Sequence, residues 1–259
     1  GGLADADGGD DAAGGADGCD RDESDEQPDD EVLAHHIHRL DRAEAVLQQR
    51  TDRFIIILEC VSNISNQFGI FRTAEALGVQ QVWIVQAERY RVSKMPDGID
   101  GISKKANQWL TVRQFESSAQ AIAAARSEGR EIWVTHLHAD RSFALQAPLQ
   151  VPPQLALIIG AEHDGASELM LEAADKAVYL PMTGFVESMN VGVATALVMQ
   201  RLFDLCPEAK GDLGVVQKAV LRRHWYGQLA RNPQQRRVFS QCADRLNAAA
   251  AVRSATADE

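Results

Sequence analysis

Short apolar segments alternate with helical ones along the middle of the chain, and this alternation constrains the fold more than any other feature of the sequence. The run Phe54-Ile55-Ile56-Ile57-Leu58 has no polar face, so a strand made of it must be buried on both sides. We expect strands at residues 54–58, 81–85, 109–113, 132–136, 155–159 and 177–180, and helices at 66–77, 117–128, 167–174 and 189–205. This pattern predicts an α/β domain over residues 51–205, with a parallel sheet covered by helices on both faces.

Helical patterns without strands flank this domain on both sides. Residues 32–50 form an N-terminal helix whose one basic side carries Arg39 and Arg42. Residues 206–259 form a C-terminal helical extension, with a linker, a helix at 215–229 and a further helix after Arg231. The basic residues of the 215–229 helix include Lys218, Arg222 and Arg223. Each basic side is either a solvated helix surface or a contact surface for an anionic partner.

The first 31 residues differ sharply in composition from the rest of the chain. They contain thirteen Asp or Glu residues and one basic residue, Arg21, in a background of Gly and Ala. Bulky apolar residues are almost absent, so this segment cannot offset the entropy lost on ordering. We therefore expect residues 1–31 to be a disordered acidic tail. Without it the net charge of −11 disappears, because 24 acidic residues face 25 basic ones.

Cysteine spacing and hydropathy indicate the compartment. The four cysteines are scattered and contain no C-x-x-C pair, which is typical of a reducing environment. No apolar run approaches the roughly 20 residues that a membrane-spanning helix needs, and no signal-peptide pattern is present. We expect a cytoplasmic protein without membrane contact, and an organellar location stays open.

Three blocks rich in glycine and short polar residues follow apolar runs. The first, at 63–78, contains Asn66 and, six residues later, Arg72; the second, at 160–165, reads Gly-Ala-Glu-His-Asp-Gly and contains Glu162. The third, at 180–194, passes from an apolar strand through a loop into a helix. Such loops can present backbone N–H groups to a ligand, although an ordinary turn has the same composition.

In order and in spacing, the three blocks resemble the three motifs of the SpoU/TrmH class of the SPOUT methyltransferases, which methylate ribose 2′-hydroxyls of RNA. The resemblance covers residues 37–205, and the flanking helices are most similar to those of the tRNA guanosine 2′-O-methyltransferase branch. It implies a homodimer and a deep trefoil knot in the C-terminal part of the domain, with the segments that carry Gly160 and Leu180 passing through one another. Periodicity alone favours an open sheet, because knots are rare.

The resemblance implies S-adenosylmethionine as cofactor. It assigns cofactor contacts to Thr135, His136, Gly160, Leu180, Met182 and Met189. We expect glycine at 160 and 184 to let the backbone approach the ligand without an intervening Cβ atom. Met189 and Gly192 stand where the family more often has Leu and Ser, which affects only the detailed shape of the cofactor pocket.

The same resemblance implies the catalytic residues Arg72, Asn66, Glu162, Ser188 and Asn190. Arg72 would activate the ribose hydroxyl, but a guanidinium stays protonated at ordinary pH. We therefore expect Arg72 to hold a phosphate and stabilise the developing alkoxide, while a phosphate oxygen or water accepts the proton. The alternative for Arg72 is a surface ion pair with Glu75. Asn66, Ser188 and Asn190 also occupy positions expected for helix N-caps.

We expect no metal. The histidines at 35, 36 and 38 and the pair at 136 and 138 lack a complementary set of ligands, and methyl transfer from a sulfonium needs no metal.

The sequence thus predicts an S-adenosylmethionine-dependent methyltransferase that acts on a tRNA ribose, most specifically the D-loop guanosine at tRNA position 18. The alternatives are the same reaction on ribosomal RNA, and a non-catalytic RNA-binding protein on a degenerate core. The presence of all five catalytic residues opposes the latter. RNA contacts are expected at Arg39, Arg42, Lys218, Arg222 and Arg223, and the acidic tail is either inert or competes with RNA for these residues.

Overall fold

A computed structural model describes residues 30–86, 106–137 and 142–257 of the chain. Residues 1–29 of the predicted acidic tail lie outside these ranges. One sheet holds the strands β1 (Phe54–Glu59), β2 (Gln81–Val85), β3 (Thr111–Phe115), β4 (Glu131–Thr135), β5 (Phe143–Ala144), β6 (Leu155–Ile159) and β7 (Lys176–Tyr179). Its order is β3-β2-β1-β6-β4-β7-β5, and every adjacent pair is parallel. The predicted parallel sheet is confirmed.

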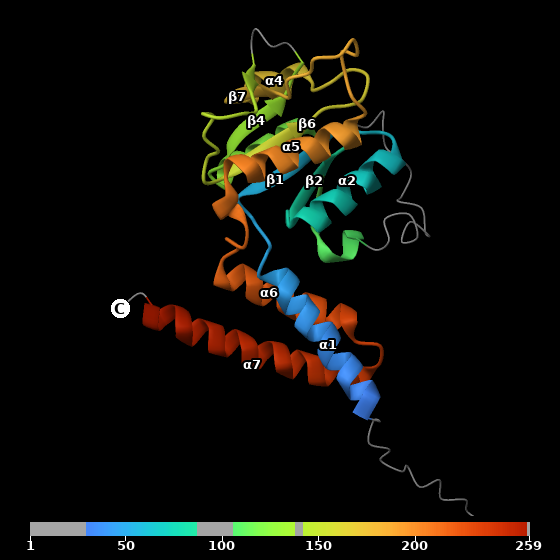
Figure 1. Ribbon diagram of the computed structural model, residues 1–259, viewed down its shortest axis with the longest axis vertical. Coiled ribbons are helices and arrows are strands. Elements are labelled where there is room, and N and C mark those ends of the chain that lie inside the picture. The colour runs from blue at the N-terminus through green and yellow to red at the C-terminus, as the bar shows by residue number, and fades with distance from the viewer. Residues whose placement is uncertain (1–29, 87–105, 138–141, 258–259) are drawn as a thin grey trace, which may run out of the picture.

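Helices cover both faces of the sheet (Figure 1). One face bears α2 (Ile64–Leu77) and α5 (Val191–Leu205), which pack against each other and against Phe54, Ile56 and Leu58 of β1. The other face bears α3 (Ser118–Ser127) and α4 (Glu168–Ala173), which share a core with Ile55 and Ile57. Successive side chains of a strand point to opposite faces, so a run of five apolar residues supplies both cores.

Three helices form a separate layer below one end of the sheet (Figure 1). These are α1 (Asp30–Leu47), α6 (Val215–Leu229) and α7 (Pro233–Ala257). Leu47 packs with Trp225, and Tyr226 packs with Phe239. The predicted helix at 215–229 is confirmed at both ends. Two short 3-10 helices are also present: η3 (Ala106–Trp109) precedes β3, and η5 (Pro207–Ala209) follows α5.

Several predicted boundaries were wrong by a few residues. Trp109 belongs to η3 and not to a strand, because its side chain packs on Trp225 outside the sheet. Strand β5 was missed, because two residues in a polar connection carry no periodic signal. None of the described helices is long and apolar enough to cross a membrane. The trefoil knot stays a prediction.

Candidate active site

A cavity of about 240 Å³ opens at the carboxyl ends of β4, β6 and β7. This edge is where open parallel sheets bind ligands, since the loops that leave the strands meet there. All the sequence-predicted cofactor residues line it: Thr135, His136, Gly160, Leu180, Met182 and Met189. Glu162 and Ser188, predicted as catalytic, line it too. The structure therefore brings segments from three parts of the chain to one place.

One wall of this cavity is apolar, and its rim is polar. Leu180 and Met189 line the cavity together with Val191, Ala194 and Val198 of α5. Sequence reasoning missed these α5 residues, although their spacing of three and four positions along a helix marks one face. At the rim, the Glu162 and Ser188 side chains are exposed. An apolar wall with a few polar groups at one end suits a ligand that has a flat aromatic part and a charged part.

Gly160 is required by the turn that follows it. A Cβ atom at this position would lie 2.1 Å from the Ala166 nitrogen and 2.2 Å from the Gly165 carbonyl carbon. The turn is closed by two backbone hydrogen bonds between Ala161 and Gly165, of 2.9 and 3.0 Å. Of the two explanations open for Gly160, the close turn is therefore the one that the structure supports, because the backbone of the turn itself fills the space where a Cβ atom would lie. At Gly184 an added Cβ atom would meet no heavy atom within 4 Å.

A chain of side-chain hydrogen bonds connects the three sequence blocks. The Asn66 amide nitrogen donates to a Glu162 carboxylate oxygen at 2.8 Å. The Asn190 amide nitrogen donates to the Asn66 amide oxygen at 3.2 Å. Together they fix the Glu162 carboxylate at the cavity rim.

One predicted helix cap next to this chain is confirmed, and two differ from the prediction. Asn190 caps α5 as predicted, since it accepts from the backbone nitrogens of Gly192 and Val193, whereas Ser188 is not the cap. Asn63, and not Asn66, caps α2, because its side-chain oxygen accepts from the Ser65 and Asn66 backbone nitrogens. Asn66 and Ser188 are thereby left free of capping roles, and Asn66 uses its amide to bridge Glu162 and Asn190.

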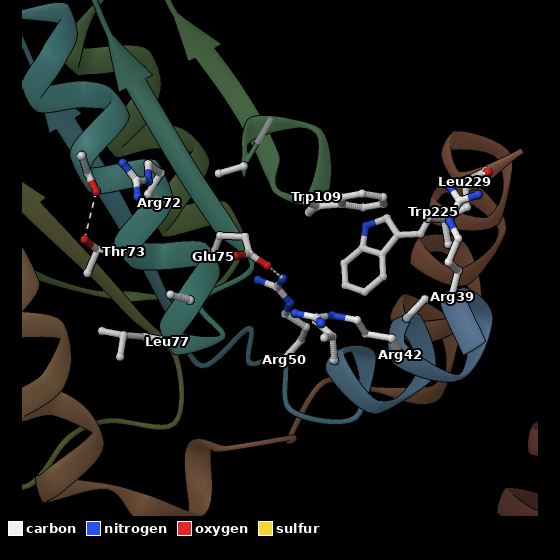
Figure 2. Close-up of a pocket in the computed structure, with 15 residues that line it drawn as sticks. Arg39, Arg42, Arg50, Arg72, Thr73, Glu75, Leu77, Trp109, Trp225 and Leu229 are labelled. Carbon is white, nitrogen blue, oxygen red and sulfur yellow. Dashed lines mark hydrogen bonds and ion pairs between the residues drawn. The ribbon is translucent and has the colours of Figure 1, made fainter. Parts of the chain in front are cut away.

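Arg72 does not line this cavity in the isolated chain. Six residues advance a helix by about 9 Å and turn it by about 240°, so Arg72 and Asn66 project to different sides of α2. Arg72 is exposed and lines a second cavity, toward η3 and α6 (Figure 2). Its alternative partner Glu75 is bound by Arg50 at 2.7 Å, so no Arg72–Glu75 pair forms.

Of the five predicted RNA-contacting residues, four are at least partly exposed to solvent and one is buried. Arg42 is exposed on α1, and Arg223 is exposed on α6 but paired with Asp244. Lys218 donates from its ammonium group to the Gly211 carbonyl at 3.0 Å, and Arg39 donates to the Leu229 carbonyl at 2.9 Å. These four retain at least partly exposed side chains.

Arg222 is the exception. Its side chain is only 5% exposed and holds both carboxylate oxygens of Glu44, at 2.7 and 2.8 Å. This ion pair ties α6 to α1, and it raises the pKa of Arg222 mainly through the hydrogen bonds to Glu44. The expected phosphate contact at Arg222 is corrected, because a buried, bidentate guanidinium has no donor face left for RNA.

We predict that Arg222→Met lowers the stability of the helical layer by about 3 kcal/mol, because it leaves the partly buried Glu44 carboxylate without its partner. Urea unfolding followed by circular dichroism measures the effect. The matched variant Arg223→Met, which removes an exposed ion pair from the same helix, should change stability by less than about 1 kcal/mol. Equal losses in the two variants would contradict the structural role of Arg222.

In the described part of the chain, no cluster of three or more His, Cys, Asp or Glu side chains is arranged to hold a metal ion. His138 and the side chains of His35 and His36 lie outside the described residues. The expectation that the enzyme uses no metal stays a prediction.

Comparison with known proteins identifies the class to which this fold and cavity belong. Residues 53–200 match the SpoU rRNA Methylase family. The chain is 31% identical over 195 residues to a tRNA (guanosine(18)-2′-O)-methyltransferase of Borreliella burgdorferi, covering 74% of this chain and 86% of that protein. It is 29% identical to the enzyme of the same name from Aquifex aeolicus, over 62% of this chain and 74% of that one. The crystal structure of the A. aeolicus TrmH/SpoU tRNA modifying enzyme superposes with a TM-score of 0.65 at 24% identity, covering 76% of this chain and all of that one.

The chain belongs to the SpoU methylase family. Members of this family transfer a methyl group from S-adenosylmethionine to a ribose 2′-hydroxyl of RNA, and this protein is an enzyme of that class.

Proposed function

We propose that the protein methylates the 2′-hydroxyl of the D-loop guanosine at position 18 of tRNA. The observation that carries this proposal is the identity of about 31% to a relative named for that reaction, across nearly the whole of that relative. The helical layer supports it, since α1 and α6 present exposed Arg42 and Arg223 beside the sheet domain. We place the enzyme with its substrate in the cytoplasm, and residues 30–47 and 215–257 act as the RNA-binding extensions.

The cavity at the carboxyl ends of β4, β6 and β7 suits S-adenosylmethionine. The apolar wall formed by Leu180, Met189 and Val191 fits an adenine ring, while Glu162 and Ser188 at the rim fit the polar end of the cofactor. When bound, the cofactor supplies an electrophilic methyl group. Asn66 and Asn190 then act as positioning residues, because they hold Glu162 in place.

Arg72 stabilises the ribose oxygen as it loses its proton. A guanidinium does not accept a proton at neutral pH, so its contribution is electrostatic and comes from two parallel N–H donors. Placed against the phosphate next to the target ribose, it also fixes the hydroxyl relative to the methyl donor. A phosphate oxygen or a water molecule takes the proton.

The test is transfer of tritiated methyl groups to total tRNA and, in parallel, to ribosomal RNA, followed by mapping of the modified nucleotide. We expect label in tRNA at guanosine 18. Label confined to ribosomal RNA would refute the tRNA assignment and retain the reaction, whereas no label in either RNA would favour a binding protein on a degenerate core. Cofactor binding, measured by calorimetry and by thermal shift, should be present without RNA.

We also propose that two copies of the chain form the working enzyme. Arg72 and the cofactor cavity lie on different sides of α2 in one chain, so a second subunit is needed to bring an Arg72 to each cavity. Helix α5 supplies a matching surface, because Val193 and Leu197 are 52% and 47% exposed and lie on one face of the helix. Single exposed apolar residues are common, but two on one helix face, with Phe185 and Val186 exposed in the segment that precedes this helix, support the proposed interface.

We predict that Leu197→Asp dissociates the dimer and raises its dissociation constant by about a hundredfold, because the carboxylate would be buried without a partner. Light scattering at micromolar concentration checks this, with a monomer mass of 28.3 kDa expected for the variant. The matched control is Val220→Asp on α6, at a residue that is 65% exposed and distant from α5 in sequence and in the fold. A wild-type protein that is itself monomeric would overturn the dimer proposal.

A further inference from the structure

A second, larger cavity lies between the sheet domain and the helical layer. It has a volume of about 910 Å³ and is bounded by α1, α2, η3 and α6 (Figure 2). None of its lining residues also lines the cofactor cavity. We call it the interlayer cavity. Its size is that of a site for a ligand as large as a nucleotide.

The interlayer cavity is strongly basic. Arg39, Arg42, Arg50 and Arg72 line it, against one carboxylate, Glu75. Glu75 is already bound by Arg50, so the charge of the other three arginines is not balanced by any residue of the lining. Guanidinium groups that line one cavity repel one another unless an anion lies between them. The charge of the cavity therefore selects a negatively charged ligand.

Unpaired hydrogen-bond donors are concentrated in this cavity. Among the described residues, six buried side-chain nitrogen or oxygen atoms have no hydrogen-bond partner, and four of them belong to residues of this lining. These four are Arg39 Nη1, Arg50 Nε, Arg50 Nη1 and Trp225 Nε1. All are N–H donors, and a buried donor without a partner is costly. A ligand with several acceptor oxygens, such as a phosphate, satisfies them.

Arg50 has two of these four unpaired donors, more than any other residue of the lining. Its side chain is fully buried, and only one of its nitrogens, Nη2, is bonded to Glu75. Its guanidinium carbon lies 5.2 Å from the Trp225 ring centre, so the ring covers one face of the group. Burial lowers the pKa of Arg50 in spite of the Glu75 carboxylate. In the bidentate pair of Arg222 with Glu44, Nε and Nη2 both donate, whereas in Arg50 only Nη2 donates to Glu75 and both Nε and Nη1 are left for other acceptors.

Two indole rings also line the interlayer cavity. Trp109 and Trp225 meet edge to face, with their ring centres 5.9 Å apart and an interplanar angle of 86°. In Figure 2 the Trp225 ring lies between Trp109 and the side chains of Arg50 and Arg42. Trp225 is buried, but Trp109 is partly exposed and can offer a ring face to a planar ligand. Aromatic faces next to arginines are typical of sites that stack a nucleic-acid base and bind its phosphate.

We propose that the interlayer cavity binds one phosphorylated nucleoside of the RNA substrate, with its phosphate at Arg50, Arg42 and Trp225 Nε1 and its base against Trp109. The inference rests on the proposed function for the identity of the RNA, and Arg72 at the same cavity connects it to the reacting ribose. A free mononucleotide has the same chemistry, so the experiment must separate the two sources.

The first arm uses the isolated ligand. Guanosine monophosphate, guanosine and inorganic phosphate are titrated into the protein with S-adenosylmethionine present at saturation, and tryptophan fluorescence is followed. We expect the monophosphate to bind at least about tenfold more tightly than guanosine, because only the phosphate meets the unpaired donors. Equal affinities for the two would overturn the proposal.

The variants test the two halves of the cavity. Trp109→Leu should weaken binding of the monophosphate about tenfold through loss of base stacking, whereas Trp109→Phe should keep it within about threefold. Arg42→Ala, at an exposed position that the fold does not need, should weaken it about tenfold as well. Arg126→Ala, at an exposed arginine of α3 in the sheet domain and outside this lining, is the matched control and should have no effect. Binding that is unchanged in both Trp109→Leu and Arg42→Ala would refute the site.

The second arm uses a tRNA transcript. Trp109→Leu and Arg42→Ala should raise the KM for tRNA about tenfold and leave cofactor affinity unchanged. If the monophosphate binds as expected but the KM for tRNA does not move, the cavity serves a free nucleotide, and the RNA assignment is overturned. If the protein methylates no RNA while the monophosphate still binds and responds to these variants, the proposed function fails and the nucleotide site stands.

Discussion

Replacing Arg72 by alanine is expected to lower the rate constant of methyl transfer by at least about a hundredfold while RNA and cofactor binding persist. The loss follows from removing a positive charge that acts on the oxygen anion as it develops, and single groups of this kind contribute factors of about a hundred to a thousand. The Arg72 side chain is exposed on α2, so the variant should stay folded. Single-turnover transfer of tritiated methyl groups to tRNA measures the effect directly.

Two further variants distinguish electrostatics from geometry at this position. Arg72→Lys keeps the charge but lacks the paired donors, so its rate should fall between those of alanine and arginine. Arg126→Ala removes an exposed arginine of α3, on the other face of the sheet, and should leave the rate unchanged. A rate for Arg72→Ala close to that of the unmodified protein would exclude Arg72 from the reaction, whatever its position in the family motif.

Replacing Gly160 by valine is expected to abolish cofactor binding and to lower the melting temperature as well. The new Cβ atom would lie within 2.5 Å of three backbone atoms of Gly165 and Ala166, and backbone cannot move aside as a flexible side chain can. Relief requires the 161–165 turn to open, which displaces Glu162 from the Asn66 amide. Displacement of about 1 Å at a binding site can cost about a hundredfold, and an overpacked site loses about 1 to 3 kcal/mol of stability.

Calorimetry with S-adenosylmethionine and a thermal melt together check this prediction. Gly184→Ala is the matched control, because an added methyl group there meets no neighbour within 4 Å. A Gly160→Val protein with normal stability and no cofactor binding would mean that the glycine serves only the ligand. Normal binding would mean that the turn is looser than its hydrogen bonds indicate.

Arg72 lies apart from the cofactor cavity within one chain. Because α2 sends Asn66 toward the cofactor cavity and Arg72 toward the interlayer cavity, a single chain holds the parts of the site at two separate places. On the dimer proposal, dilution below the dissociation constant should reduce methyl transfer more than cofactor binding.

The sequence by itself determined the sheet and its helices. Short, fully apolar runs rich in β-branched residues favour strands buried on both faces, and the even and odd residues of β1 indeed enter different cores. A local signal also located the end of α2, because Gly78 closes this helix in a left-handed conformation that suits glycine. The six predicted cofactor contacts were assigned by the resemblance to the SpoU/TrmH class, and the structure places all six around one cavity at the carboxyl ends of β4, β6 and β7.

Only the tertiary structure decided which polar residues act together. Asn66 meets Glu162, 96 positions away, and Asn190, 124 positions away, so no local pattern could distinguish its bridging role from that of a cap. Arg222 looked like Arg223 in the sequence, but Glu44, 178 positions away, holds it in the interior. Arg50 and Trp225 acquire unpaired donors in the same way, because burial is a property of packed surfaces and not of a segment. The type of a side chain and its spacing in the sequence indicate which bonds it can form. Long-range packing determines which partner the side chain reaches and whether water can replace that partner.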